Sequence, residues 1–322
     1  MKFRTEIEVA PWHHNIDYGH TILSLGSCFA TNIAERLGEL KFRVTANPTG
    51  ILFNPQSIAQ SVEQMASRRM VTSDDLFETD GRWLSYDFHS SLSGATATLA
   101  AEVMNAKIEL GHQALQHANH LIITLGTAWV YRLCATGKTV ANCHKQPHSL
   151  FRRELLSVAE IVDSLESIVN SCSAHVILTL SPIRHIGEGV EDNSLSKALL
   201  RVAIEECRRR HPERVTYFPS YEILMDDLRD YRFYGDDLVH PSPMAVDYIV
   251  DKFFGAALST ATKQKMERVS KIVVAANHRT QNPHSEQHKS FCRRQMEAID
   301  ELHGIDLSKE REHFERMLQI NL

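Results

Sequence analysis

The chain has 322 residues, of which 43% are hydrophobic and 23% are charged, and its net charge is -5. This composition is typical of a folded globular protein and excludes disordered, collagen-like and coiled-coil classes. The acidic balance provides no basic face for phosphate backbones, so nucleic acid is not expected as a partner. No apolar run approaches the roughly 18 residues of a membrane helix. The first six residues lack the apolar core of a secretory signal, so we expect a cytoplasmic protein without membrane insertion.

The six cysteines are scattered through the chain without CxxC pairs. Neither a zinc ribbon nor a dense disulfide framework is therefore predicted, and reduced thiols are expected. No cofactor is predicted.

The first half of the chain begins with a buried strand at 21–25 and a helix that includes 32–37, joined by a tight corner at Gly26-Ser27-Cys28. A short strand at 42–44 leads into a Pro- and Gly-containing loop, and Asn54-Pro55 opens a helix. Residues 73–93 are expected to be irregular. The elements expected next are a helix at about 96–117 and an apolar strand at 120–125.

A capping box at Ser157 and Glu160 predicts a helix that runs to about residue 171. The elements expected after it are a strand at 176–180, a helix at about 193–210, a strand at 215–218 and a helix that begins after Pro241. Alternating strands and helices predict a doubly wound α/β fold with a mostly parallel sheet.

Beyond residue 259 the pattern changes to polar helices at about 260–276, 288–302 and 308–319. We therefore predict an α/β domain over residues 1–258 and a C-terminal helical extension over 259–322. A lid or a packing arm without chemistry is the expected role of this extension.

Ligands bind at the carboxyl ends of the strands in open parallel sheets, so the loops after the strands are the places to search. Four of these loops carry reactive or polar groups. They are Gly26-Ser27-Cys28, Gly126-Thr127-Ala128-Trp129, Ser181-Pro182-Ile183-Arg184-His185 and Asp236-Asp237-Leu238-Val239-His240-Pro241.

Cys28 is expected at the first turn of a helix, where free backbone N–H groups and the helix dipole favour a thiolate. It is therefore a candidate nucleophile with a lowered pKa. The alternative is a small buried residue that fills a crevice between strand and helix.

Asp237-x-x-His240-Pro241 places a carboxylate three residues before an imidazole. The carboxylate can accept a hydrogen bond from one ring nitrogen while the other faces a nucleophile. An orienting acid and a base are what a Cys or Ser nucleophile needs, although the same string also suits a structural junction between loop and helix.

The string Gly26-Ser27-Cys28-Phe29-Ala30, together with the Asp237–His240 block, resembles the GSCFA family, which is related to the SGNH/GDSL hydrolases. Further strings share this resemblance. They are Asn47-Pro48-Thr49-Gly50-Ile51, Gly126-Thr127-Ala128-Trp129-Val130, Asn142-Cys143-His144-Lys145, Ser181-Pro182-Ile183-Arg184-His185 and Asp230-Tyr231-Arg232-Phe233-Tyr234.

The resemblance implies an SGNH-like three-layer α/β/α fold and ester chemistry. It places Cys28 at the position of the SGNH nucleophile and Ser27 at the preceding aspartate, whereas a shift of one residue would make Ser27 the nucleophile. The asparagine that supplies an oxyanion donor in SGNH enzymes is missing from Gly126-Thr127-Ala128-Trp129. The candidate donors are the backbone amides of Cys28 and Gly50 and the side chain of Asn142.

Other positions in these strings are candidates for substrate contacts. Asn142-Cys143-His144-Lys145 could line the pocket, with His144 as a second acid or base and Lys145 binding an anion, or it could be an exposed polar turn. Arg184 suits a carboxylate or phosphate, but with His185 it could equally form surface ion pairs. The remaining candidates are Asn47 and Thr127.

These features predict an esterase, acyl hydrolase or acyltransferase that acts on a small-molecule or glycan acyl ester through an intermediate on Cys28 or Ser27. Two other classes remain open. One is a ligand-binding SGNH-like module without catalysis. The other is a metal-binding protein, whose possible ligands are Cys28, Cys143, His144, His148 and His240. The sequence predicts no oligomeric state.

Overall fold

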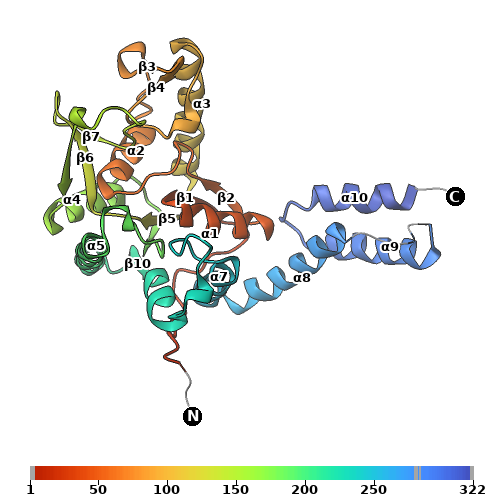
Figure 1. The fold of residues 1–322 in the computed structure, drawn as a ribbon. Coiled ribbons are helices and arrows are strands. Elements are labelled where there is room, and N and C mark those ends of the chain that lie inside the picture. The colour runs from red at the N-terminus through yellow and green to blue at the C-terminus, as the bar shows by residue number, and fades with distance from the viewer. Residues whose placement is uncertain (1–3, 279–281, 283, 320–322) are drawn as a thin grey trace.

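A computed structural model describes residues 4–278, 282 and 284–319, and its central element is a parallel sheet of five strands in the order β10-β9-β5-β1-β2 (Figure 1). The strands are β1 (Thr21–Gly26), β2 (Arg43–Ala46), β5 (His120–Leu125), β9 (His175–Leu180) and β10 (Val215–Phe218). The doubly wound α/β fold predicted from the sequence is therefore confirmed.

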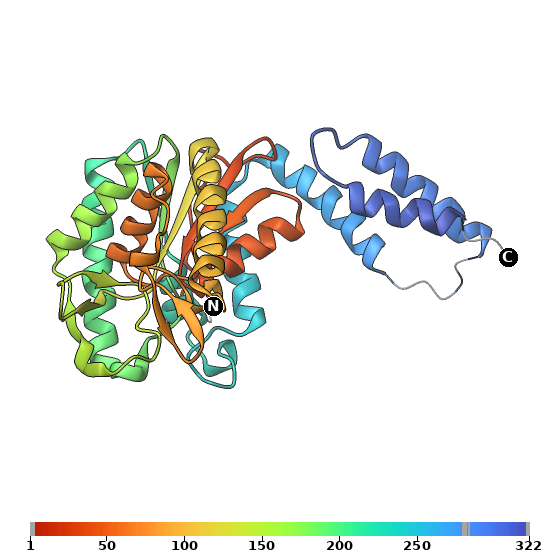
Figure 2. The same cartoon turned by 90° about the horizontal axis from the view of Figure 1, so that it is seen from above.

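Helices cover both faces of this sheet (Figure 2). One core cluster joins the sheet to α2 (Pro55–Ser67), α3 (Ala97–His117), α4 (Val158–Asn170) and α5 (Val190–Arg210). A second cluster joins the other face to α1 (Cys28–Glu39), the π-helical turn Ile223–Leu228 and α7 (Pro243–Ala257). The short helix α6 (Ser220–Glu222) precedes that turn. Alternate residues of each strand face opposite clusters, as Ile22 and Leu23 of β1 show.

Local sequence signals set several of these helix ends. The Asn54 side chain accepts a hydrogen bond from the Ser57 amide (2.8 Å) at the start of α2, where Pro55 takes the first helical position. Ser157 and Glu160 form the predicted capping box of α4.

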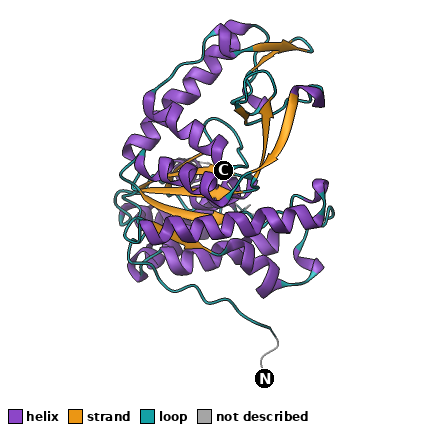
Figure 3. Cartoon of the chain, turned by 90° about the vertical axis from the view of Figure 1, so that its left-hand side faces the viewer, coloured by secondary structure: helices purple, strands orange, loops and turns teal. Residues whose placement is uncertain are grey.

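Two small antiparallel sheets lie beside the central sheet (Figure 3). The first is the hairpin of β3 (Phe77–Thr79) and β4 (Arg82–Leu84), which lies within the segment 73–93 that was expected to be irregular. Asp80 and Gly81 both have positive φ angles (50° and 72°), and this turn geometry fits the twist of a hairpin. That expectation was therefore wrong, because an Asp-Gly turn joins two strands too short to show a pattern.

The second antiparallel sheet has the order β7-β6-β8. It consists of β6 (Trp129–Leu133), β7 (Thr139–Val140) and β8 (Phe151–Leu155). Because β6 begins three residues after β5, this sheet stands directly beside the carboxyl edge of the central sheet.

The C-terminal segment forms α8 (Thr260–Asn277), α9 (Glu286–Asp300) and α10 (Ser308–Gln319). Figures 1 and 2 show that α9 and α10 lie beside each other, away from the sheet, at the far end of α8. An ion pair between Lys41 and Glu310 (2.6 Å) ties α10 back to the α/β body. The predicted boundary at 258/259 coincides with the short connection between α7 and α8, and its independence as a folding unit stays a prediction.

The strand order places a topological switch point between β1 and β5. The chain moves outward from β1 to β2 and then returns to the other side of β1 to build β5, β9 and β10. Loops leave β1 and β5 in opposite directions at such a point, which opens a crevice at their carboxyl ends. The loops after these two strands contain Cys28 and Thr127. Within the described ranges, none of the helices is apolar over a length that could cross a bilayer.

Candidate functional site

The turn from β1 into α1 is a tight elbow. Gly26 has a φ of 127°, and a side chain there would place a Cβ 2.1 Å from the Thr124 carbonyl oxygen of β5. Only glycine fits this close approach. Ser27 follows as the N-cap of α1, and Cys28 is its first helical residue.

Ser27 and Cys28 differ in accessibility. Ser27 is 1% exposed, and its hydroxyl is buried without a hydrogen-bond partner among the described residues. Cys28 is partly exposed. Cys28 is therefore the more accessible of the two residues.

The pKa of Cys28 differs from the expectation. Burial raises the pKa of this thiol, and the smaller effect of its own backbone N–H in the opposite direction does not compensate. The expected low-pKa thiolate is therefore wrong. Desolvation disfavours the charged form more strongly than the helix N-terminus stabilises it.

Asn47 holds the elbow in place. Its Oδ1 accepts a hydrogen bond from the Gly26 amide (2.8 Å), and its Nδ2 donates to Thr31 Oγ1 on α1 (3.2 Å). These two bonds hold Gly26, which precedes Cys28 in the chain, and Thr31, which follows it. The side chain of Asn47 is thus committed to the protein, and the loop 47–52 lies along the first turn of α1.

Gly50, another candidate, lies in the same loop. Its amide donates to the Asn47 carbonyl (2.8 Å), so it is engaged in a turn instead of being available to an oxyanion. Its φ is 93°, and a Cβ there would lie 2.2 Å from the Cβ of His89. His89 therefore packs directly against the Gly50 backbone.

Asp237 and His240 form the pair that their spacing predicts. The Asp237 Oδ2 lies 2.6 Å from the His240 Nδ1, and its Oδ1 accepts from the backbone amides of Val239 and His240. The amides, His240 first, and the imidazole hold the pKa of Asp237 down at about 2. Because the ionised carboxylate can only accept, Nδ1 carries the proton and Nε2 is left as an acceptor.

Arg184 is bonded to the same loop. Its guanidinium donates to the Leu238 carbonyl (2.9 Å) and lies over the Tyr234 ring, 5.0 Å from the centroid. Leu238 has a φ of 56°, an uncommon value for a residue with a side chain. The contacts of Arg184 thus hold the turn between Asp237 and His240.

His185 is placed against the loop that follows β5. A Cβ at Gly126 would lie 3.0 Å from its Nε2, and its ring meets Phe53 edge-on with centroids 5.5 Å apart. Burial, followed by the charges of Lys197 and His240, lowers the pKa of His185 to about 4. The ring is therefore neutral at physiological pH, with Nε2 lacking a partner in the described part of the chain.

Lys197 was not singled out from the sequence. It is 3% exposed, and its Nζ donates to the Ser181 carbonyl (2.8 Å) beneath the loop that carries His185. Burial lowers the pKa of Lys197 to about 7. The sequence feature that indicates its burial is its position three residues before Leu200, on the inward face of α5.

A cavity of about 770 Å³ opens beside these loops. Thr127 and His185 line it, as do the aromatic residues Phe53, Trp129 and Tyr131. Cys28, Gly50 and His240 are not among its lining residues. The full lining is Phe53, Asn54, Thr127, Trp129, Tyr131, Val140, Ala141, Asn142, Cys143, Lys145, Gln146, Pro147, His148, His185 and Gly187.

The Asn142–Lys145 turn lines this cavity only in part. Asn142, Cys143 and Lys145 face it, whereas the His144 Nε2 donates to the Ser85 carbonyl (2.8 Å). Burial lowers the pKa of His144 and raises that of Cys143 to about 11. The Asn142 Oδ1 accepts from the His144 amide, which leaves its amide nitrogen without a hydrogen bond within the described ranges.

Thr127 is bonded within the protein as well. Its Oγ1 accepts from the Trp129 amide (3.1 Å) and lies 3.2 Å from the Ser196 hydroxyl. Ser196 also accepts from the Ala128 amide (2.7 Å), and Ala128 is fully buried. Ala128, which the sequence resemblance places at the position of the oxyanion asparagine, is therefore part of the core.

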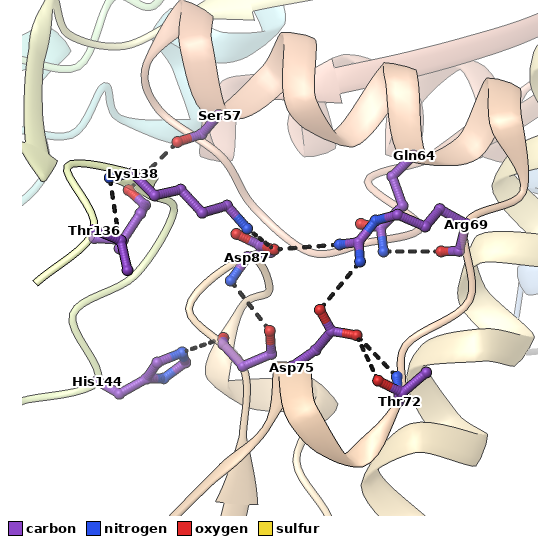
Figure 4. A network of polar contacts seen from close by, with 11 residues as sticks. Ser57, Gln64, Arg69, Thr72, Asp75, Asp87, Thr136, Lys138 and His144 are labelled. Carbon is purple, nitrogen blue, oxygen red and sulfur yellow. Dashed lines mark hydrogen bonds and ion pairs between the residues drawn. The ribbon is translucent and has the colours of Figure 1, made fainter. Parts of the chain in front are cut away.

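A polar network fixes the segment from Ser85 to His89, which the sequence analysis passed over (Figure 4). Asp87 lies between Lys138 (2.6 Å) and Arg69 (3.7 Å), and Ser85 accepts from His144. The network joins α2, the β3–β4 region and the β6–β8 sheet. The signal for this segment was the string Asp87-Phe88-His89-Ser90, in which polar residues flank one phenylalanine without helical or strand periodicity.

The metal-ligand hypothesis finds no support in the arrangement. Among the residues that the structure describes, no group of three or more His, Cys, Asp or Glu side chains could hold an ion. The hypothesised ligand His144 is bonded to Ser85, and His240 is bonded to Asp237.

Profiles of known protein families match most of the chain. The profile of the GSCFA family matches residues 21–253, which include the elbow, the cavity loops and the Asp237–His240 pair. The chain belongs to the GSCFA family. A second profile, the C-terminal domain of GSCFA domain proteins, matches residues 269–320.

A comparison with curated protein sequences gave no match. Among solved structures, the chain is similar to a family 3 carbohydrate esterase from Clostridium thermocellum, with 11% sequence identity and a TM-score of 0.34. The alignment covers 78% of this chain and 98% of the esterase.

Proposed function

We propose that this GSCFA protein is an acyl hydrolase or acyltransferase whose covalent intermediate forms on Cys28. The observation that carries the proposal is the hydrogen bond between Asp237 and His240 Nδ1, which leaves Nε2 of the neutral ring as a proton acceptor at the same sheet edge as the partly exposed Cys28. The strand order supports this, because Cys28 lies at the switch point where doubly wound folds bind ligands.

Helix α1, which begins with Cys28, and the segment that follows His240 border one surface hollow. Asn32, one turn after Cys28 on α1, and Pro241, next to His240, line the same surface hollow. No direct hydrogen bond joins Cys28 to His240 within the described chain. In ligand-free enzymes, such bonds often tighten only when substrate binds.

The raised pKa of Cys28 determines how the first step proceeds. The resting group is a thiol, so His240 Nε2 removes its proton as Sγ attacks the carbonyl carbon of the ester. The tetrahedral adduct collapses, the C–O bond breaks, and the imidazolium returns the proton to the departing alcohol. This leaves a thioester on Cys28.

The second step regenerates the thiol. His240 takes a proton from water or from an acceptor alcohol, whose oxygen attacks the thioester carbonyl. The C–S bond breaks, the proton passes to Sγ, and a carboxylic acid or a new ester is released. The Cys28 amide, which has no i−4 carbonyl partner because it begins α1, provides one oxyanion donor in both steps.

The cavity beside Thr127 and His185 would hold the part of the substrate that does not react. Its aromatic wall suits a ring or an acyl chain, and Lys145 suits an anionic group. Small-molecule and glycan esters both fit these features.

Mass spectrometry of the intact protein with p-nitrophenyl acetate tests the proposal. We expect one acetyl group, mapped to the peptide that contains Cys28, and none in Cys28→Ala. Ser27→Ala, a matched control at the adjacent position, should still be labelled. A label that persists in Cys28→Ala and disappears in Ser27→Ala would assign the nucleophile to Ser27.

The non-catalytic alternative also has a specific observation in its favour, because Cys28 does not line the large cavity. A chain that binds ligands there without ever acquiring an acyl group from activated esters would support a binding module instead.

A further inference from the structure

We infer that His89 is a catalytic residue of the proposed acyl-transfer reaction, whose Nε2–H donates a hydrogen bond to the oxyanion. This inference rests on the proposed function and goes beyond it by naming a group in place of the donor lost at Ala128. Three observations carry it: the tautomer of His89, its contact with the elbow loop, and the engagement of the Gly50 amide.

The tautomer follows from a local hydrogen bond. The Ser91 backbone amide lies 3.2 Å from the His89 Nδ1, and a backbone amide can only donate. Nδ1 is therefore an acceptor, so in the neutral ring Nε2 carries the hydrogen. His89 thus presents a donor at the far end of its ring.

The position follows from the loop that brackets Cys28. Asn47 binds Gly26 on one side of the nucleophile and Thr31 on the other, and the Leu52 amide donates to the Gly26 carbonyl (3.0 Å). Gly50 lies in the middle of this loop. The Cα, Cβ and Cγ of His89 pack against Gly50, so the base of the His89 side chain lies beside the loop that encloses the elbow.

The need for a side-chain donor follows from what the loops lack. The Gly50 amide is bonded to Asn47, and Ala128 has no donor and is buried. Among the groups of the elbow and the loop 47–52, this leaves the Cys28 amide, and the loss of one oxyanion donor typically costs on the order of 100- to 1000-fold in rate. A neutral imidazole donates without the desolvation cost of burying a charge.

The surroundings keep His89 in one place. Asp87, two residues earlier, is held by Lys138 and Arg69, and the His89 amide lies 3.5 Å from the Thr49 carbonyl (Figure 4 shows the Asp87 contacts). Preorganised donors stabilise developing charge without reorganising during the reaction.

Two substitutions separate catalysis from structure. His89→Asn keeps an oxygen that can accept from the Ser91 amide but removes the distal donor, and we expect about a 100-fold loss in the rate of Cys28 acylation by p-nitrophenyl acetate with little change in KM. His89→Gln restores an N–H donor near the position of Nε2 and should recover part of the rate. Both variants should melt like the wild type.

Control variants separate the role of His89 from the proposed acyl-transfer function. His117→Asn, at the end of α3, should react like the wild type. If the wild type acquires an acyl group and His89→Asn reacts at the same rate, the role of His89 is overturned while the proposed function stands. If Asn142→Ala loses rate and His89→Asn does not, Asn142 is the donor. A wild-type chain that is never acylated overturns both.

Discussion

The two edges of the central sheet both carry histidines, but in opposite environments. At the carboxyl edge, the His240 side chain is 53% exposed and is bonded to an ionised carboxylate. At the amino edge, His120 and His175 begin β5 and β9 and are buried. The partners of these two are other polar side chains: the His120 Nε2 lies 3.2 Å from the His20 Nδ1, and the His175 Nε2 lies 2.8 Å from the Thr216 hydroxyl.

Burial at the amino edge changes the pKa values of its histidines. Burial, followed by the charges of neighbouring histidines, lowers the pKa values of His120 and His175 to about 4. These rings stay neutral and pack against one another; the rings of His14 and His175 stack with centroids 4.4 Å apart. A histidine therefore acts as a base only where the fold provides a carboxylate and access to substrate.

From the contrast between the two edges of the sheet, we expect the largest change in acylation rate when His240, the proposed base, is replaced. His240→Ala should reduce the rate of acylation by p-nitrophenyl acetate at least about 1000-fold, because the substitution removes the proposed acceptor of the thiol proton. Asp237→Asn should cost less, since the carboxylate orients the ring and stabilises its charge.

His120→Gln is the matched control from the amino edge. It should retain the acylation rate at temperatures where the protein is folded. A folded His240→Ala protein with the wild-type rate would remove His240 from the mechanism.

The two buried histidines of the amino edge, His120 and His175, should contribute to the pH dependence of stability. Their pKa is about 4 in the folded state and about 6.5 when unfolded, so the unfolded state binds more protons between these values. Stability is therefore highest above pH 6.5 and falls as the pH falls towards 4, by on the order of 3 kcal/mol for each group. Urea denaturation at pH 7.5 and at pH 5 measures the loss.

Replacing the two rings gives the control for this effect. His120→Gln/His175→Gln should be less stable than the wild type at pH 7.5 but should show a flatter dependence between pH 7.5 and pH 5. An equal slope in the two proteins would place the titrating groups elsewhere.

The reactivity of the thiols should follow their burial. Because its pKa is raised, Cys28 should be alkylated by iodoacetamide at pH 7 several-fold more slowly than the exposed Cys134, and its rate should increase as the pH is raised. Peptide mapping after limited labelling measures both rates. Preferential labelling of Cys28 at pH 7 would show a thiolate and contradict the general-base step.

The smallest effect is expected at the cavity rim. Lys145→Ala should raise KM several-fold for an ester that carries a carboxylate and leave kcat unchanged, because an exposed lysine contributes to binding alone. A neutral ester of the same size should show no difference. Equal changes in KM for both esters would show that Lys145 does not recognise the charge of the substrate.

Contacts within one turn of chain could be read from the sequence. The Asp237–His240 bond, the Asn54 cap and the capping box of Ser157 and Glu160 join residues three apart, so backbone geometry alone brings their atoms together. The order of strands and helices was also readable, because apolar periodicity identifies each element and parallel connections leave few topologies.

Only the tertiary structure decided the properties that depend on distant segments. The pKa of Cys28 is set by packing around the elbow, and the Gly50 amide is taken by a turn whose shape no local pattern indicates. The contact between Gly50 and His89 joins segments 39 positions apart, which single-sequence periodicity cannot pair. Burial and long-range contact arise when elements pack, and for this reason the sequence indicated the candidate nucleophile and base but not the environment in which they would act.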